Sequence, residues 1–228
     1  IRNKYNIKVI EDCAESHGAE YKGKKIGNFG DISTFSFYSN KLITTGEGGM
    51  VLTSNKKFAD RARGYKNLFF GKTDRFKHKD LGSNYRLTNI QAAIGYSQTK
   101  RINSIVEKKR KIGFWYLHYL KDINKLELQK EMSWAKTVFW MYAVVIKSSA
   151  IDAKKIINAM AKRNIQCRPL FYNLNKQPFL SKFNIKDNRK YPVTDKLAKY
   201  GFYLPSSLKL TKKDVVYIVN QLKEVLDG

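Results

Sequence analysis

The chain has 228 residues, with 44 Lys or Arg against 19 Asp or Glu, so its formal net charge is +25 at pH 7. A hydrophobic content of 43% excludes global disorder. The two cysteines, Cys13 and Cys167, exclude a disulfide-dense scaffold and fit a reducing compartment such as the cytoplasm. No apolar run approaches the roughly 20 residues of a membrane span, so we expect no membrane partner.

The basic excess is spread along the sequence. Residues 1–104 contain 19 Lys or Arg against 9 Asp or Glu, and residues 105–228 contain 25 against 10. No zinc-finger spacing, RNP-like aromatic motif or basic-zipper pattern is present. We therefore expect no nucleic-acid partner, although a basic nucleic-acid-binding protein stays open as an alternative. A phosphate-bearing small substrate would also favour a basic cleft.

The first part of the chain has segments with the composition of strands. They are rich in β-branched and aromatic residues and are bounded by glycine-containing turns. These predicted strands cover residues 8–10, 32–37 and 50–53. A helix is predicted over residues 56–69, where apolar side chains recur every three or four positions, and a loop over residues 71–86.

A long helical stretch is predicted from Thr88 to Leu120, with Thr88 as its N-cap and breaks at Gly95 and Gly113. The remaining predicted elements are a strand over residues 138–146, a helix over residues 152–163 and a C-terminal helix that a capping box at Thr211–Asp214 opens. An α/β sheet usually has five or six strands, and the first part offers about three. Together with the missing initial Met, this favours a chain that begins within a longer protein.

Polar side chains lie where the first strands are predicted to end. Asp12 follows the first strand, Ser36 closes the second, and Lys41 comes five residues later. Ligands of open α/β sheets bind beyond the carboxyl ends of strands. An amine can form a Schiff base with a carbonyl, a carboxylate can pair with a pyridine nitrogen, and a hydroxyl can hold a phosphate. Together, Asp12, Ser36 and Lys41 suit the binding of pyridoxal phosphate. Each residue alone also fits an ordinary role, such as a solvated surface side chain or a helix cap.

Longer runs around these residues resemble a known family. The runs are Val9 to Ala19, Gly30-Asp31, Phe35 to Phe37, Asn40-Lys41, Thr44 to Met50, Asn84 to Ala93, Arg168 to Tyr172 and Leu204 to Ser206. They are similar to the DegT/DnrJ/EryC1/StrS family of pyridoxal-phosphate sugar aminotransferases. The resemblance implies an α/β, aspartate aminotransferase-like fold of type I. Residues 1–104 would form the remainder of the large cofactor-binding domain, and residues 105–228 a smaller α+β domain.

The resemblance also implies roles for individual residues. Lys41 would bond covalently to pyridoxal phosphate and later move a proton between the cofactor and the substrate carbon. Asp12 would pair with the pyridinium nitrogen, and Glu15 would lie near the ring or its 3-hydroxyl. Ser36 would bind the cofactor phosphate. Asn84 would reach the phosphate of the neighbouring subunit's cofactor, in an active site shared across a homodimer.

Lysine at position 41 indicates the reaction, because relatives with His at this position dehydrate their sugar instead of aminating it. The resemblance therefore implies that glutamate donates an amino group to a nucleotide-linked keto sugar, of the 4-keto-6-deoxy kind, for amino-sugar and polysaccharide biosynthesis. A non-catalytic or regulatory relative with the same fold is the alternative. Arg86 has either a substrate-binding or a structural role, and Asn175 stands where relatives often have His.

The remaining polar candidates have ordinary explanations. His17 fits a core or loop histidine near the end of a strand, although a direct catalytic role stays open. His78 and His118 have no Cys or carboxylate at metal-ligand spacing, so no metal site is predicted. Cys13 fits a small buried side chain better than a reactive thiol.

Overall fold

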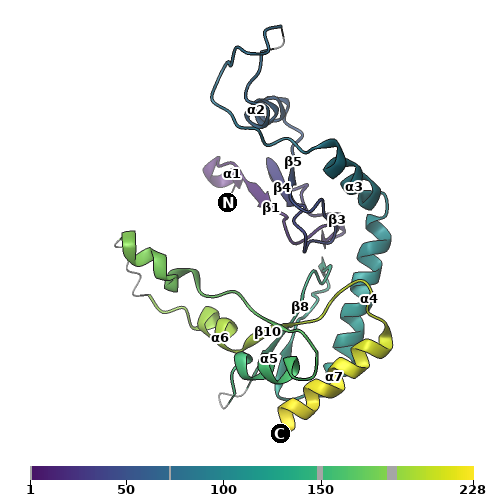
Figure 1. The fold of residues 1–228 in the computed structure, drawn as a ribbon. Helices are drawn as coiled ribbons and strands as arrows, with labels where there is room; N and C mark the ends of the chain where they lie inside the picture. Colours follow the sequence, from purple (N-terminus) through teal and green to yellow (C-terminus); the bar gives the residue numbers. More distant parts are fainter. Residues whose placement is uncertain (1, 72, 148–150, 184–188) are drawn as a thin grey trace. The chain divides into compact units, whose positions relative to one another are not determined.

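The computed structural model describes residues 2–71, 73–147, 151–183 and 189–228 (Figure 1). Within these ranges the chain divides into two compact units. The first comprises Ile1–Glu107 and Glu131–Trp140, and the second comprises Lys108–Lys130 and Met141–Gly228. Residues 131–140 therefore fold with the first unit, although they lie in the sequence between two parts of the second.

The strands β1 (Ile10–Asp12), β4 (Ile32–Ser36) and β5 (Gly49–Leu52) form one sheet of the first unit, in the order β1-β4-β5. β1 and β4 are parallel, whereas β4 and β5 are antiparallel. Because β1 and β4 run in the same direction, they bring Asp12 and Ser36 to the same edge of the sheet. β4 and β5 match the predicted strands to within one residue. β1 lies two residues later than predicted, so Asp12 is its last residue.

A second sheet of the first unit consists of β2 (Glu20–Tyr21), β3 (Lys24–Lys25) and β7 (Ala135–Lys136), in the order β3-β2-β7. Lys22 and Gly23 have φ angles of 48° and 77°, which suits a two-residue hairpin turn between β2 and β3. β7 pairs with β2 and so attaches residues 131–140 to the first unit. Such two-residue strands carry no periodicity, and the sequence did not predict them.

The helices α1 (Arg2–Tyr5), α2 (Lys56–Lys66) and α3 (Asn89–Thr99) belong to the first unit, and α4 (Ile102–Leu120) runs from it into the second. Thr88 caps α3 in a capping box with Gln91, as predicted. The helical stretch predicted from Thr88 to Leu120 is confirmed, but its break falls at residues 100–101 and not at the two predicted glycines. Gly95 and Gly113 lie inside α3 and α4 and interrupt neither helix.

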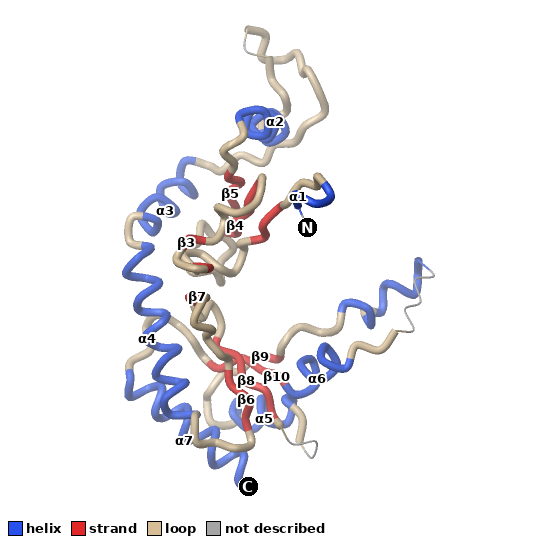
Figure 2. The backbone as a smooth tube through the Cα atoms, turned by 180° about the vertical axis from the view of Figure 1, so that it is seen from behind, coloured by secondary structure: helices blue, strands red, loops and turns tan. Residues whose placement is uncertain are grey.

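The second unit contains an antiparallel sheet in the order β6-β8-β10-β9 (Figure 2). Its strands are β6 (Leu126–Leu128), β8 (Tyr142–Ile146), β9 (Arg168–Pro169) and β10 (Gly201–Leu204). Its helices are α5 (Ala153–Ala161), α6 (Pro192–Tyr200) and α7 (Lys212–Asp227), with 3-10 turns at Leu174–Lys176 and Pro178–Phe183. The strand predicted over residues 138–146 begins only at Tyr142, since Phe139 has a φ of 48°, outside the β region.

The core of the second unit joins its sheet to its helices. Tyr142 and Phe202 from the sheet are completely buried, as are Tyr116, Ile156 and Leu222 from α4, α5 and α7. Each such side chain stabilises the fold by about 1.5–3 kcal/mol relative to exposure. The capping box predicted at Thr211–Asp214 is confirmed.

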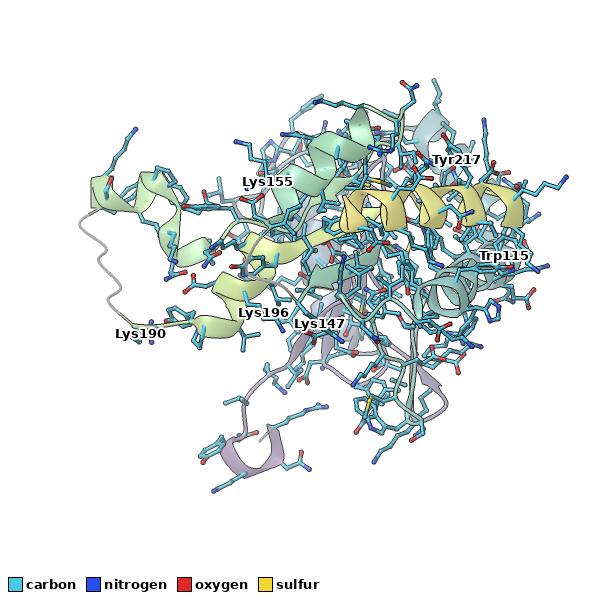
Figure 3. All side chains as sticks on the ribbon, turned by 90° about the horizontal axis from the view of Figure 1, so that it is seen from below. Trp115, Lys147, Lys155, Lys190, Lys196 and Tyr217 are labelled. Atoms are coloured by element: carbon cyan, nitrogen blue, oxygen red, sulfur yellow. The ribbon has the colours of Figure 1, made fainter. Side chains whose placement is uncertain are left out.

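Basic side chains of the second unit come from separate elements. Lys147 follows β8, Lys155 lies on α5, Lys190 precedes α6 and Lys196 lies on it, and all are exposed (Figure 3). The positive charge is thus distributed over the surface instead of following one helix. Among the described residues, the helices are too short or too polar to span a membrane.

Candidate active site

The end of β1 presents Asp12 on an ordered turn. Asp12 Oδ1 accepts a hydrogen bond from the backbone N–H of Ala14 at 3.1 Å, while Cys13 N donates to Thr34 O at 2.8 Å. This local bond orients the carboxylate, and the side chain stays exposed. At the end of β4, Ser36 Oγ accepts from Tyr38 N at 3.2 Å in the same manner. Both predicted ligands are therefore held by their own backbone at one edge of the sheet.

The neighbouring Glu11 has a structural role. Its carboxylate accepts hydrogen bonds from the backbone N–H groups of Gly27, Phe29 and Gly30 at 2.9, 2.7 and 2.5 Å. Burial raises the pKa of Glu11, but the three N–H donors outweigh burial and lower it below its ordinary value. Glu11 and Asp12 are adjacent acidic residues in the sequence, but they differ in the structure. Glu11 holds the backbone of residues 27–30, whereas the Asp12 carboxylate is exposed.

Lys41 lies close to the end of β1 although it follows β4 in the sequence. Its side chain is only 11% exposed, and Nζ lies 3.3 Å from Glu15 Oε1. The next two residues, Leu42 and Ile43, are buried and fix the backbone beside it. The structure thus brings two predicted site residues together, an amine and a carboxylate from the ends of neighbouring parallel strands.

The loop after Lys41 is closed by hydrogen bonds and by a glycine. Thr45 N donates to Phe37 O at 2.9 Å, and Phe37 N donates to Gly48 O at 2.8 Å. Gly48 has a φ of 138°, and a Cβ there would lie 2.6 Å from Leu87 Cδ2 and 2.7 Å from Thr45 Oγ1. Only glycine fits this position without displacing its neighbours.

Helix α3 supports this loop with polar side chains. Gln98 accepts a hydrogen bond from Thr44 N at 3.1 Å and donates one to Thr44 O at 2.8 Å. Gln91 Nε2 donates to Glu47 O at 3.2 Å. These glutamines turn the polar side of α3 toward the loop and thereby fix the chain that follows Lys41.

His17 is a core residue next to the site. It is 4% exposed, and its ring centroid lies 5.4 Å from that of Phe35 and 6.0 Å from that of Phe37. Burial lowers the pKa of His17, and the nearby charge of Lys41 acts in the same direction. The imidazole is therefore neutral at pH 7, which agrees with the interpretation of His17 as a core histidine.

Other predicted residues lie outside this cluster. Arg86 Nε donates to Asn84 Oδ1 at 2.7 Å, and both side chains are exposed. Neither contacts Asp12, Ser36 or Lys41 among the described residues of the chain. The structure therefore assembles Lys41 with Glu15 at the sheet edge but does not bring Asn84 to them within one chain.

Asn175 belongs to the second unit, in the short turn Leu174–Lys176, and is partly buried. The adjacent Asn173 is buried and donates from Nδ2 to Asp195 Oδ1 at 2.6 Å, while Lys176 pairs with the same carboxylate. This turn is therefore held by Asp195 of α6. Among the described residues, no group of three or more His, Cys, Asp or Glu side chains could hold a metal ion.

Trp140 is a residue of the site that sequence reasoning missed. Its Nε1 donates to Asn40 O at 2.8 Å, and Lys41 Nζ lies 4.2 Å from the centroid of its ring. Trp140 follows Lys41 by almost a hundred residues and stands within a segment that the sequence predicts as a strand. No local signal in a single sequence reveals this contact, because it depends on residues 131–140 folding with the first unit.

The chain matches the model of the DegT/DnrJ/EryC1/StrS aminotransferase family over residues 1–223, and it belongs to that family. GDP-perosamine synthase of Escherichia coli O157:H7 is 39% identical over 220 residues, which cover 96% of this chain and 58% of that protein. GDP-perosamine synthase of Caulobacter vibrioides is 32% identical over 228 residues, or 99% of this chain and 61% of that protein. The chain thus spans about 60% of the length of these relatives.

The same match appears among solved structures. The aminotransferase PseC of Helicobacter pylori, described as involved in the biosynthesis of pseudoaminic acid, superposes with a TM-score of 0.91 at 24% identity. The likeness covers 99% of this chain and 61% of that one. The predicted α/β, aspartate aminotransferase-like fold is confirmed. Aminotransferases of this family depend on pyridoxal phosphate, which confirms the predicted cofactor at the level of the family.

Proposed function

We propose that this protein transfers an amino group from glutamate to a nucleotide-linked keto sugar of the 4-keto-6-deoxy hexose kind, with pyridoxal phosphate as cofactor. The observation that carries the proposal is the approach of Lys41 Nζ to Glu15 Oε1 at 3.3 Å, next to the strand that ends at Asp12. Family membership and the likeness to GDP-perosamine synthases support the same reaction. The sequence run from Phe37 to Gly49 also resembles those synthases.

The residues present fit the chemistry of the cofactor. Pyridoxal phosphate has an aldehyde, a pyridine nitrogen, a 3-hydroxyl and a phosphate. Lys41 offers a sheltered amine for the aldehyde, and Asp12 offers an exposed carboxylate whose Oδ1 already accepts from Ala14 N. Ser36 offers a hydroxyl at the same edge of the sheet. When bound, the cofactor supplies an electron sink for the negative charge that develops at the reacting carbon.

Each residue would perform one task. The Asp12 carboxylate would hold the proton of the pyridine nitrogen through a charge-assisted hydrogen bond. Lys41 Nζ would move a proton from the carbon of the amino donor to the cofactor. With the keto sugar, it would move a proton from the cofactor to the sugar carbon. The Ser36 hydroxyl would bind the phosphate. Glu15 would orient Lys41 Nζ while that amine is not bonded to the cofactor. Glu15 would also lie near the 3-hydroxyl.

We propose a homodimer that shares its active sites, with Asn84 reaching the partner's cofactor phosphate. Helix α3 supports this assembly. Its apolar side chains Ile90, Ile94 and Tyr96 are 76%, 45% and 65% exposed in the single chain. Large exposed apolar side chains are what a subunit contact would cover.

We further propose that residues 1–104 belong to the cofactor-binding domain and residues 105–228 to the smaller domain, apart from residues 131–140, which fold with the first unit. A cytoplasmic location agrees with Cys13 and Cys167, which are both buried and unpaired. Burial raises the pKa of both thiols, that of Cys167 to about 11, so neither is prepared for redox chemistry.

The proposal is tested by incubating the protein with pyridoxal phosphate, glutamate and a small panel of nucleotide-linked keto sugars. Mass spectrometry of the products should show an amino sugar together with an equal amount of 2-oxoglutarate. The Lys41→Ala variant should form neither. Cofactor binding without amination of any sugar would favour the non-catalytic relative, and no cofactor binding at all would overturn the assignment.

A further inference from the structure

Trp140 contacts both the backbone and the amine of the lysine segment. Its indole N–H donates to the carbonyl of Asn40 at 2.8 Å, and its ring lies under Lys41 Nζ at 4.2 Å. The distance from Nζ to the ring centroid is well inside the roughly 6 Å within which a cation is attracted to an aromatic face. Glu15 approaches the same nitrogen at 3.3 Å. The amine is therefore in contact with both a carboxylate and an indole ring.

The position of Trp140 is itself fixed. Its ring packs against the buried cluster formed by Ala19, Leu42, Val106 and Val138. The residue before it, Phe139, has a φ of 48°, a conformation that is unfavourable for any residue with a Cβ. Such a conformation persists only where surrounding contacts impose it, and it is concentrated at functional sites. The buried Phe139 side chain supplies one such contact.

We propose that Trp140 is a positioning residue for Lys41, which keeps Nζ beside Glu15 whenever the amine is not bonded to the cofactor. This inference rests on the proposed function of Lys41. In each half-reaction Lys41 must act on a proton as a free amine at the end of a flexible side chain. The indole face limits where that nitrogen can go, and the bond to Asn40 limits where the backbone that carries it can go.

Trp134 provides a matched control within the same segment. Its ring packs edge-on against Tyr21, with the centroids 5.5 Å apart. No lysine amine lies over its ring among the described residues, and it is 47% exposed. Trp134 and Trp140 therefore share a residue type and a segment, and they differ in the contact with Lys41.

The test replaces the indole hydrogens of Trp140 with one, two and four fluorines by site-specific incorporation. Fluorine keeps the shape of the ring and the N–H donor but weakens the attraction of its face for a cation. Acetylation of Lys41 by acetic anhydride is then measured in the cofactor-free protein by peptide mass spectrometry. Lys100, whose amine lies 4.5 Å from the centroid of Tyr96, serves as the internal reference.

We expect the acetylation rate of Lys41 to rise with each fluorine, by roughly 2- to 10-fold over the series, while that of Lys100 stays constant. The same fluorines at Trp134 should leave Lys41 unchanged. In the enzyme with bound cofactor, the series should lower kcat and leave KM unaltered. Trp140→Phe, which keeps a ring but removes the donor to Asn40, should lower kcat further than the monofluoro protein.

Equal acetylation of Lys41 across the Trp140 series would overturn the proposal and leave Trp140 as a packing residue. An equal response to fluorines at Trp134 would also overturn it. Failure of the proposed function is a separate result, because the wild-type protein would then aminate no keto sugar while the acetylation of Lys41 still responded to the series.

Discussion

Lys41 and Lys109 are both little exposed, one in each unit, but their amines meet different partners. Lys41 Nζ lies beside the Glu15 carboxylate and over the Trp140 ring. Lys109 Nζ on α4 donates to the carbonyl of Ser206 and, at 2.8 Å, to its hydroxyl. No carboxylate pairs with Lys109 among the described residues, and burial lowers its pKa to about 8.

We infer from this comparison that a lowered lysine pKa does not by itself mark a reactive amine. The partners of Lys41 are two side chains, the Glu15 carboxylate and the Trp140 ring. The partner of Lys109 is Ser206, through its carbonyl and its hydroxyl, in the turn after β10. Tyr116 also donates to Pro205 O in this turn, at 2.7 Å. We interpret Lys109 as a structural residue that holds this turn against α4. Matched changes at the two lysines separate these roles.

The largest effect is expected from replacing the two lysines by methionine. Lys41→Met removes the amine that moves the proton, so amination should fall by on the order of 10³-fold or more. Lys109→Met keeps the length of the side chain and should retain the cofactor and the activity at temperatures where it is folded. Product formation from glutamate and a nucleotide-linked keto sugar measures both variants. Comparable losses in the two would contradict the assignment.

The next effect is the pH dependence of stability that Lys109 produces. Its pKa is about 8 in the folded protein and 10.5 as an ordinary lysine, so between these values the unfolded chain binds the additional proton. Stability therefore rises with pH across this window, by about 3 kcal/mol in total, and the burial cost is fully present below pH 8. Urea unfolding at pH 7.5, 9 and 10.5 checks this prediction.

Lys109→Met provides the reference for this pH experiment. The difference in unfolding free energy between wild type and variant removes the contributions of all other groups. That difference should shift in favour of the wild type as the pH rises. A difference that is flat from pH 7.5 to 10.5 would show that Lys109 titrates normally.

A smaller effect separates two glycines beyond Lys41. Gly48→Ala adds a Cβ that meets Leu87 and Thr45 at under 3 Å, and should cost about 2–3 kcal/mol of stability. Gly46 also has a positive φ, of 78°, but nothing lies within 4 Å of its added Cβ. Gly46→Ala should therefore cost only about 1 kcal/mol. Urea unfolding of both variants measures these losses of stability. Equal losses would mean that the backbone at Gly48 moves to accommodate the added Cβ.

The smallest effect concerns the helix caps of the two units. Thr88 accepts a hydrogen bond from Gln91 N at 3.2 Å, and Thr211 accepts one from Asp214 N at 3.3 Å. Replacing either Thr by Ala should cost about 1 kcal/mol, and Ser should restore most of it. Thermal unfolding of the four variants measures this. A loss that Ser does not restore would indicate that the methyl group, and not the cap, is responsible.

The parts that could be predicted from the sequence are those with local physical signals. The capping boxes at Thr88 and Thr211 and the periodic faces of α5 and α7 gave helices with nearly correct ends. Asp12 and Lys41 were proposed as site residues because strand ends and residue chemistry point to them, and their roles stay predictions. The break after α3 was misplaced, since glycine is a weak local signal and helix packing overrides it.

The rest depended on contacts between segments that are distant in the sequence. Trp140 meets Lys41 only because residues 131–140 return to the first unit. Lys109 lies in the basic run Lys108-Lys109-Arg110-Lys111, yet it is 7% exposed, and Ser206 accepts its hydrogen bonds. Neither contact has a periodicity or a motif. The structure was needed to show that these two little-exposed lysines have different partners.

The most direct test is to locate the lysine that bonds to the cofactor. The protein is mixed with pyridoxal phosphate, reduced with borohydride, digested and mapped by mass spectrometry. We predict that the pyridoxyl group is found on Lys41, that Lys109 is unmodified, and that Lys41→Met carries no stoichiometric label. A label on Lys109, or one scattered over the exposed lysines, would contradict the account.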